Sequence, residues 1–223
     1  MTQLLISVTS INEAKIALEN GADIIDMKDP SAGALGALSI ADIASIVTFV
    51  NKKKLTSATI GDQPMQPDLL VQRVAEVAKT NVDFIKIGFF ETSDYQSCLD
   101  ALELAKQTGI KLIAVLFAEY TYPSNIIVTI KNAGFIGVMV DTAIKNGLTL
   151  MDYHSESHIK NLSQNVLEID LSFGLAGSLK IQHIETLQKF NATYMGFRGG
   201  VCEENLRYLC LNASKIKAIR KTL

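Results

Sequence analysis

The chain has 223 residues, of which 48% are apolar and 20% charged, and its formal net charge is −2. This apolar and nearly neutral composition excludes an intrinsically disordered protein and lacks the general basic character of a nucleic-acid-binding protein. No apolar run approaches the roughly 20 residues that a membrane-spanning helix needs.

Strand-like and helix-like segments alternate along the chain. Runs rich in Val, Ile and Leu predict eight strands, at Leu4–Val8, Asp23–Lys28, Leu55–Ile60, Phe84–Ile87, Lys111–Phe117, Ile136–Val140, Leu167–Phe173 and Thr193–Phe197. Apolar residues spaced three and four apart predict helices between the early strands, at Asn12–Asn20, Ile40–Asn51 and Pro67–Lys79. A helical segment follows each later strand as well.

Eight strand–helix units predict a parallel sheet that closes into a (β/α)8 TIM barrel, formed as one domain by residues 1–223. Dividing 223 residues among eight units gives about 28 residues each, close to the smallest such barrel. The alternative is an open, doubly wound sheet. The first predicted strand is followed by Thr-Ser-Ile-Asn, without the GxGxxG turn that holds a pyrophosphate in such sheets, so the barrel is favoured.

Two charged residues stand at the end of the second predicted strand. Because side chains alternate along a strand, Asp26 and Lys28 point to one side, and Ile25 and Met27 to the other. If the apolar pair faces the helices, Asp26 and Lys28 project into the barrel, where parallel-barrel enzymes carry their active sites. The alternative is a buried ion pair that only fills the barrel floor.

Charged residues also lie within or just after later predicted strands. Lys86 lies among apolar residues in the fourth predicted strand, Asp141 ends the sixth, and Lys145 follows in the next loop. A lysine in such a run is costly to bury unless it is paired or reactive. An amine attacks a carbonyl only when neutral, and neighbouring cations and desolvation lower its pKa from about 10.4. The cluster therefore predicts carbonyl chemistry through a lysine Schiff base.

Glycine-rich turns follow the last two predicted strands. Ala176, Gly177 and Ser178 come after the seventh strand, and Arg198, Gly199 and Gly200 after the eighth. These are the positions where many barrels bind phosphate through backbone N–H groups. We expect a hydroxyl contact from Ser178 and a charge-assisted contact from Arg198.

Other conspicuous residues give weaker evidence about function. His154 and His158 have helical spacing, but no third metal ligand is evident, so we predict an exposed helix face and neither a metal nor a cofactor. The segment 31–36 is a candidate lid, or only a glycine turn.

Three cysteines without CxxC spacing and an N-terminus without a secretory signal lead us to expect a cytoplasmic protein.

Several of these segments occur in the order found in one known family. They are Asp23-Ile-Ile-Asp-Met-Lys-Asp-Pro30, Ser57-Ala-Thr-Ile-Gly-Asp62, Ile85-Lys-Ile-Gly88, Asp141-Thr-Ala-Ile-Lys-Asn-Gly147, Leu175-Ala-Gly-Ser178 and Arg198-Gly199. Nearly end to end, the sequence resembles the (5-formylfuran-3-yl)methyl phosphate synthases of methanogens and methylotrophic bacteria. Asp29 departs from the asparagine expected at its position.

The resemblance implies a barrel lyase that condenses two molecules of glyceraldehyde 3-phosphate with loss of phosphate and water, for methanofuran or methylofuran synthesis. By that similarity, Lys28 is the Schiff-base lysine and Lys86 the proton acceptor. Asp26, Asp141 and Lys145 match further active-site positions. The expected partner is a triose phosphate, without a nucleic acid or a membrane, and the chain could be a homo-oligomer.

Two alternatives stay open at this stage. One is another Schiff-base aldolase or a triose- or sugar-phosphate isomerase on the same scaffold, and the other is a phosphometabolite-binding barrel without turnover. The role that the resemblance gives Lys28 leads us to expect that Lys28→Ala abolishes turnover. The position of Arg198 after the eighth strand leads us to expect that Arg198→Ala mainly weakens phosphate binding.

Overall fold

The computed structural model describes residues 2–223, apart from the side chains of residues 104, 106 and 107. The strands are β1 (Gln3–Val8), β2 (Ile24–Met27), β3 (Leu55–Thr59), β4 (Phe84–Phe89), β5 (Leu112–Phe117), β6 (Gly137–Asp141), β7 (Ser172–Leu175) and β8 (Tyr194–Phe197). The α-helices are α1 (Ile11–Glu19), α2 (Ile40–Val50), α3 (Pro67–Ala78), α4 (Tyr95–Gln107), α5 (Ile126–Asn132), α6 (Leu150–Tyr153), α7 (Glu156–Leu167), α8 (Ile184–Gln188) and α9 (Ala213–Thr222). Short 3₁₀ turns are η1 (Ile181–His183), η2 (Gly199–Val201) and η3 (Glu203–Asn205).

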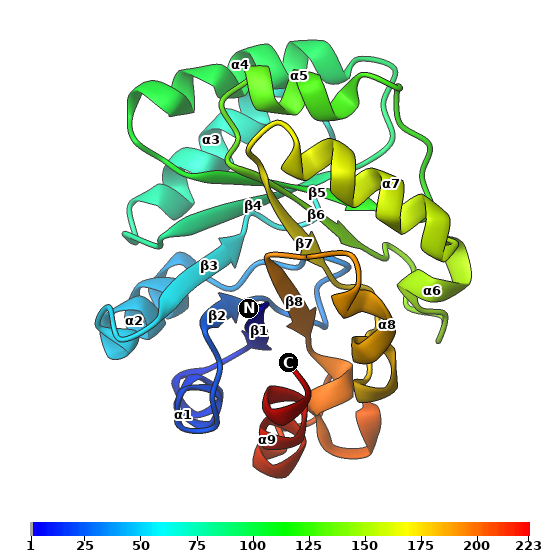
Figure 1. Ribbon diagram of the computed structural model, residues 1–223. Coiled ribbons are helices and arrows are strands. Elements are labelled where there is room, and N and C mark those ends of the chain that lie inside the picture. The colour runs from blue at the N-terminus through cyan, green and yellow to red at the C-terminus, as the bar shows by residue number, and fades with distance from the viewer. Residues whose placement is uncertain (1) are drawn as a thin grey trace.

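The eight strands form one closed, parallel barrel in sequence order, in which β8 pairs with β1. The helices surround the barrel, and both chain ends lie beside it (Figure 1). The predicted (β/α)8 barrel is thereby confirmed, and the open sheet is excluded.

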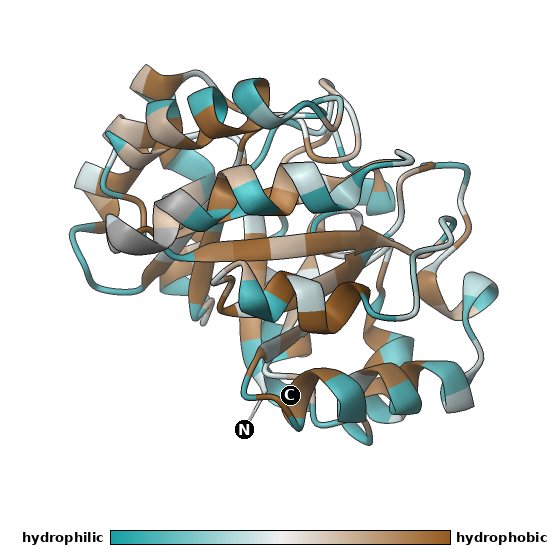
Figure 2. Ribbon diagram, turned by 90° about the horizontal axis from the view of Figure 1, so that it is seen from above, coloured by the Kyte–Doolittle hydropathy of each residue, from teal (hydrophilic) through white to brown (hydrophobic). Residues whose placement is uncertain are grey.

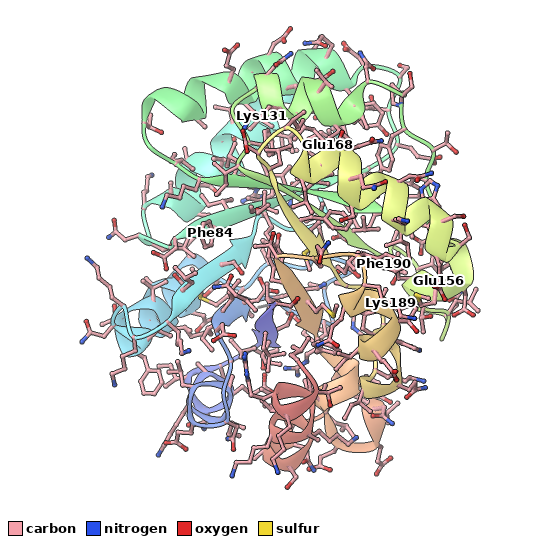
Figure 3. The ribbon with its side chains drawn as sticks, viewed as in Figure 1. Phe84, Lys131, Glu156, Glu168, Lys189 and Phe190 are labelled. Carbon is pink, nitrogen blue, oxygen red and sulfur yellow. The ribbon has the colours of Figure 1, made fainter. Side chains whose placement is uncertain are left out.

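Apolar side chains fill two concentric spaces, which explains the continuous apolar runs of the strands. One core lies between strands and helices and includes Ile25 and Met27, whereas a smaller core lies inside the barrel and includes Leu5 and Ile113. Figure 2 shows the strands mostly hydrophobic and the outer helices mixed. The charged residues Glu156 and Lys189 are exposed at the periphery, whereas Phe190, next to Lys189 in the chain, is buried (Figure 3).

The predicted seventh strand, Leu167–Phe173, was wrong at its start. Leu167 is the last residue of α7, and β7 begins at Ser172 after a turn in which Asp170 has a φ of 56°. Apolar residues continue without interruption from the end of the helix into the strand, so their pattern does not mark the turn between them.

None of the helices within residues 2–223 combines the length and hydropathy that a bilayer crossing needs.

Candidate active site

Asp26 and Lys86 form an ion pair inside the barrel. Lys86 Nζ on β4 lies 2.6 Å from Asp26 Oδ1 on β2, and the two side chains are only 3% and 1% exposed. Hydroxyl groups from the neighbouring strands also donate to this carboxylate. Ser7 Oγ donates to Asp26 Oδ2 at 2.8 Å, and Ser57 Oγ donates to Asp26 Oδ1 at 2.6 Å. The carboxylate is therefore fixed by three donors from three strands.

Asp141 joins the other two lysines. Lys28 Nζ lies 3.2 Å from its Oδ2 atom and Lys145 Nζ 3.0 Å from its Oδ1 atom. The backbone N–H of Thr142 also donates to Oδ1, at 2.7 Å, and Lys145 donates to the Thr142 carbonyl at 2.6 Å. Thus the residue that follows β2 and the loop after β6 bring two amines to the carboxylate at the end of β6.

Burial and charge set the protonation of these groups. Burial lowers the pKa of Lys86, although the attraction of Asp26 opposes the shift. Burial likewise lowers the pKa of Lys145 against the attraction of Asp141. For Asp141, burial alone would raise the pKa, but Lys145 and Lys28 outweigh it and hold that pKa well below its usual range. The site therefore combines an ionised carboxylate with amines that lose a proton more readily than ordinary lysines.

Replacing Asp141 with asparagine is expected to lower the free energy of unfolding by about 3–5 kcal/mol at pH 7, because the buried Lys28 and the partly buried Lys145 lose their carboxylate. The pKa of Asp141 is depressed in the folded state, so its contribution is complete above the unfolded value of about 3.9 and is lost as the pH falls further. Urea unfolding at pH 7 and pH 3 measures this, and the gap between wild type and variant should narrow at pH 3. An equal gap at both pH values would contradict the ion-pair assignment. The exposed Asp170→Asn change is the control, expected within about 0.5 kcal/mol of wild type.

The predicted catalytic and phosphate-binding residues all surround one cavity of about 390 Å³ at the carboxyl ends of the strands. The amine and carboxylate groups of Asp26, Lys28, Lys86, Asp141 and Lys145 line it together with both predicted phosphate turns, Ala176–Ser178 and Arg198–Gly200. The volume lies within the range of small-molecule sites. Because the cluster holds three lysines and two aspartates, the cavity suits an anionic ligand.

The glycine-rich turns have backbone conformations that glycine favours, and they carry unused backbone donors. Gly177 and Ser178 both have left-handed backbone, with φ values of 97° and 53°. A Cβ atom at Gly200 would lie 2.4 Å from the Leu179 carbonyl oxygen, so only glycine lets the two turns approach. Within residues 2–223, the N–H groups of Ser178, Gly199 and Gly200 have no acceptor. They are available to a ligand.

Arg198 lines the same cavity but is fully engaged by the protein. Its guanidinium forms a bidentate pair with Glu13, at 2.5 and 3.1 Å. Its remaining N–H groups donate to the carbonyls of Ser7, Arg207 and Leu209, at 3.1, 2.7 and 3.1 Å. An arginine has five N–H donors, and these contacts use all of them. The expected charge-assisted contact of Arg198 with phosphate therefore has no donor left to make it, and the residue instead holds the β8 turn against α1.

Replacing Arg198 with alanine is accordingly expected to destabilise the fold by about 3–5 kcal/mol, because Glu13 stays buried without its cation. Urea unfolding measures the loss, and the double change Arg198→Met with Glu13→Leu should recover part of it. If Arg198→Ala instead unfolds at the same urea concentration as wild type and binds phosphate weakly, this account of Arg198 is wrong. The expectation from the sequence, that the variant mainly loses phosphate affinity, would then hold.

Three residues at the site were not predicted from the sequence, namely Ser7, Ser57 and Arg207. Ser7 and Ser57 occupy inward positions of their strands, so the same alternation that selected Asp26 could have found them. Arg207 also lines the cavity, but it lies in an irregular segment after β8, where no periodic pattern points to it.

The candidate lid is held against the barrel. The Asp62 carboxylate accepts hydrogen bonds from the N–H groups of Ala34 and Leu35, at 2.8 and 2.6 Å, and Thr59 Oγ1 donates to the Gly36 carbonyl at 3.0 Å. Leu35 is 1% exposed and belongs to the inner core. This loop therefore forms part of the wall of the barrel mouth.

The His154 and His158 rings stack with their centroids 4.3 Å apart. In the described part of the chain, no group of three or more His, Cys, Asp or Glu side chains could hold a metal ion.

Comparison with known proteins identifies close relatives. A family model described as 4-HFC-P synthase matches residues 4–220. The (5-formylfuran-3-yl)methyl phosphate synthase of Methanococcus aeolicus is 34% identical over 210 residues, which cover 89% of this chain and 89% of that protein. That of Methanocaldococcus jannaschii is 34% identical over 214 residues, 90% of each chain. A Methylorubrum extorquens protein given the same name provisionally is 36% identical over 214 residues, 96% of this chain and 88% of that one.

Solved structures share the architecture at low sequence identity. A crystal structure of 3-hexulose-6-phosphate synthase has a TM-score of 0.68 and 16% identity, and covers 100% of both chains. Phosphoribosyl anthranilate isomerase from Thermus thermophilus has a TM-score of 0.69 and 13% identity, covering 99% of this chain and 98% of its own. At these identities the comparison shows the barrel fold alone.

Proposed function

The chain belongs to the 4-HFC-P synthase family, and from that premise we propose that it condenses two molecules of glyceraldehyde 3-phosphate into (5-formylfuran-3-yl)methyl phosphate through a Schiff base on Lys28. The observation that carries the proposal is one cavity in which paired lysines and aspartates lie beside two glycine-rich turns. Two triose phosphates contain the atoms of this product plus one phosphate and two waters. The reaction therefore needs no oxidant or reductant.

Lys28 is the better placed of the two strand-end lysines to form the iminium. Its contact with Asp141 is longer, at 3.2 Å, than the 2.6 Å contact of Lys86 with Asp26, and its side chain is 8% exposed against 3%. In the proposed step, the neutral Lys28 amine attacks the aldehyde carbon of one triose phosphate, and water leaves. The ionised Asp141 stabilises the positive charge that the iminium retains.

Lys86 then acts as the proton acceptor. It removes the proton from the carbon next to the iminium, which gives an enamine, and its lowered pKa favours the neutral amine that this step requires. The enamine electrons expel phosphate from the adjoining carbon as that C–O bond breaks. The second triose first isomerises to its ketose form, as one proton moves from its C2 to its C1, and the enol carbon adds to the resulting C2 carbonyl. The C1 hydroxyl of that triose then closes the ring on the carbonyl carbon next to the iminium, and two waters are lost as the furan forms. One water finally hydrolyses the iminium, which releases the aldehyde and frees Lys28, so the net loss is two waters.

Incubation with glyceraldehyde 3-phosphate as the sole substrate tests the proposal. The expected result is a furan aldehyde detected by its ultraviolet absorbance and by its mass, with one inorganic phosphate released per product. Dihydroxyacetone phosphate as the only product would identify an isomerase and overturn the proposal. Binding without any product would identify a phosphometabolite-binding barrel.

A further inference from the structure

Arg207 is the second arginine at the barrel mouth, and its surroundings differ from those of Arg198. It lines the same cavity as Lys145 and Ser178, on the segment between η3 and α9. Among residues 2–223, no carboxylate lies within 4.0 Å of its guanidinium, although Asp141, Asp62 and Asp29 all attract its charge. Arg207 is therefore a half-buried cation without a direct counter-ion.

The hydrogen bonds of Arg207 leave most of its donors unused. Its one bond to the described protein atoms runs from Nη2 to the Gly33 carbonyl, at 2.7 Å. An arginine has five N–H donors, so four remain for a ligand. A guanidinium matches the oxygens of a phosphate group in a bidentate arrangement.

The backbone of Arg207 also adjoins the phosphate turns. A Cβ atom on Gly199 would lie 3.9 Å from both the backbone N and the Cβ of Arg207. The free N–H groups of Gly199 and Gly200 belong to residues that line the same cavity as Arg207, whose guanidinium keeps free donors. The cavity thus offers both backbone donors and a positive charge, a combination that suits a phosphate group.

We propose that Arg207 supplies the cation of the phosphate site formed with Ser178, Gly199 and Gly200, and that its hydrogen bond to Gly33 couples phosphate binding to the loop at residues 31–36. The ligand class is a phosphate monoester or inorganic phosphate. Its identification with a substrate phosphate rests on the proposed function, whereas the anion site itself does not.

Calorimetric titration with inorganic phosphate tests the site without requiring turnover. Arg207→Gln is expected to weaken phosphate binding about 10- to 100-fold, which corresponds to about 1.4–2.8 kcal/mol. Arg207→Lys keeps the positive charge but loses the planar guanidinium that can contact two phosphate oxygens at once, so it should weaken phosphate binding several-fold. Lys160→Gln, which removes the same charge from the exposed face of α7, should stay within about twofold of wild type.

Phosphate binding to Arg207→Gln within twofold of wild type would overturn the proposal, as would a wild-type protein that binds no phosphate. If Arg207→Gln does not fold, Arg207→Met decides, since phosphate binding by that uncharged variant within twofold of wild type contradicts the proposal. Hydrogen–deuterium exchange tests the coupling: phosphate should slow exchange at Ala34 and Leu35 in wild type but not in Arg207→Gln. A wild type that binds phosphate at Arg207 but makes no furan would refute the proposed function and leave this site intact.

Discussion

Replacing Lys28 with alanine is expected to abolish the covalent adduct with triose phosphate and to reduce turnover on the order of 10⁴-fold or more, because no other group takes over a missing nucleophile efficiently. Steady-state kinetics with glyceraldehyde 3-phosphate measure the loss. The fold should survive, since Asp141 retains Lys145 and the Thr142 N–H as partners.

Lys28→Arg is the matched control for this prediction. It keeps a positive charge beside Asp141, but an arginine stays protonated and forms no iminium. Both variants should therefore be inactive, while phosphate binding to Lys28→Arg stays close to that of wild type. Near-normal turnover by Lys28→Ala would make the iminium mechanism untenable.

Replacing Lys86 with methionine is expected to lower kcat about 10²- to 10⁴-fold, the usual contribution of a general base, while the adduct at Lys28 still forms. Exchange of the proton next to the triose carbonyl with solvent deuterium should be lost. In the wild type, burial lowers the pKa of Lys86, so activity should rise with pH along a curve whose midpoint lies below the ordinary lysine value of about 10.4. Full deuterium exchange in Lys86→Met would contradict its role as the proton acceptor.

The same substitution separates catalysis from stability. Without Lys86, the Asp26 carboxylate stays buried with only the Ser7 and Ser57 hydroxyls as donors, at a cost of about 3–5 kcal/mol. Adding Asp26→Asn removes the unpaired charge and should restore part of the free energy of unfolding without restoring turnover. Recovery of turnover in the double variant would show that Lys86 acts only as a structural partner of Asp26.

The parts of the site that lie on strands could be predicted from the sequence. The alternation of Asp26 and Lys28 with Ile25 and Met27 determines which side chains face inward once the strand is placed. Parallel strands then bring their carboxyl ends together, which is why Lys86 and Asp141 join the same cavity. The barrel itself follows from eight units without a break in composition.

The roles of Arg198 and Arg207 could not be predicted from strand periodicity. The partner of Arg198 is Glu13, 185 positions away in the sequence, and their contact exists only because β8 closes against β1. Arg207 lies in an irregular segment, where neither strand nor helix periodicity says which way a side chain points. The position of a phosphate-turn arginine after the eighth strand favours Arg198, yet Arg207 has the free donors.

Trapping of the covalent intermediate is the most direct test of a Schiff base on Lys28. The protein is incubated with glyceraldehyde 3-phosphate and sodium borohydride, digested, and mapped by peptide mass spectrometry. The account predicts a reduced triose phosphate adduct on Lys28 that is absent without substrate and absent from Lys28→Arg. An adduct on Lys86 or Lys145 instead, or furan formation by a protein that gives no adduct at all, would contradict it.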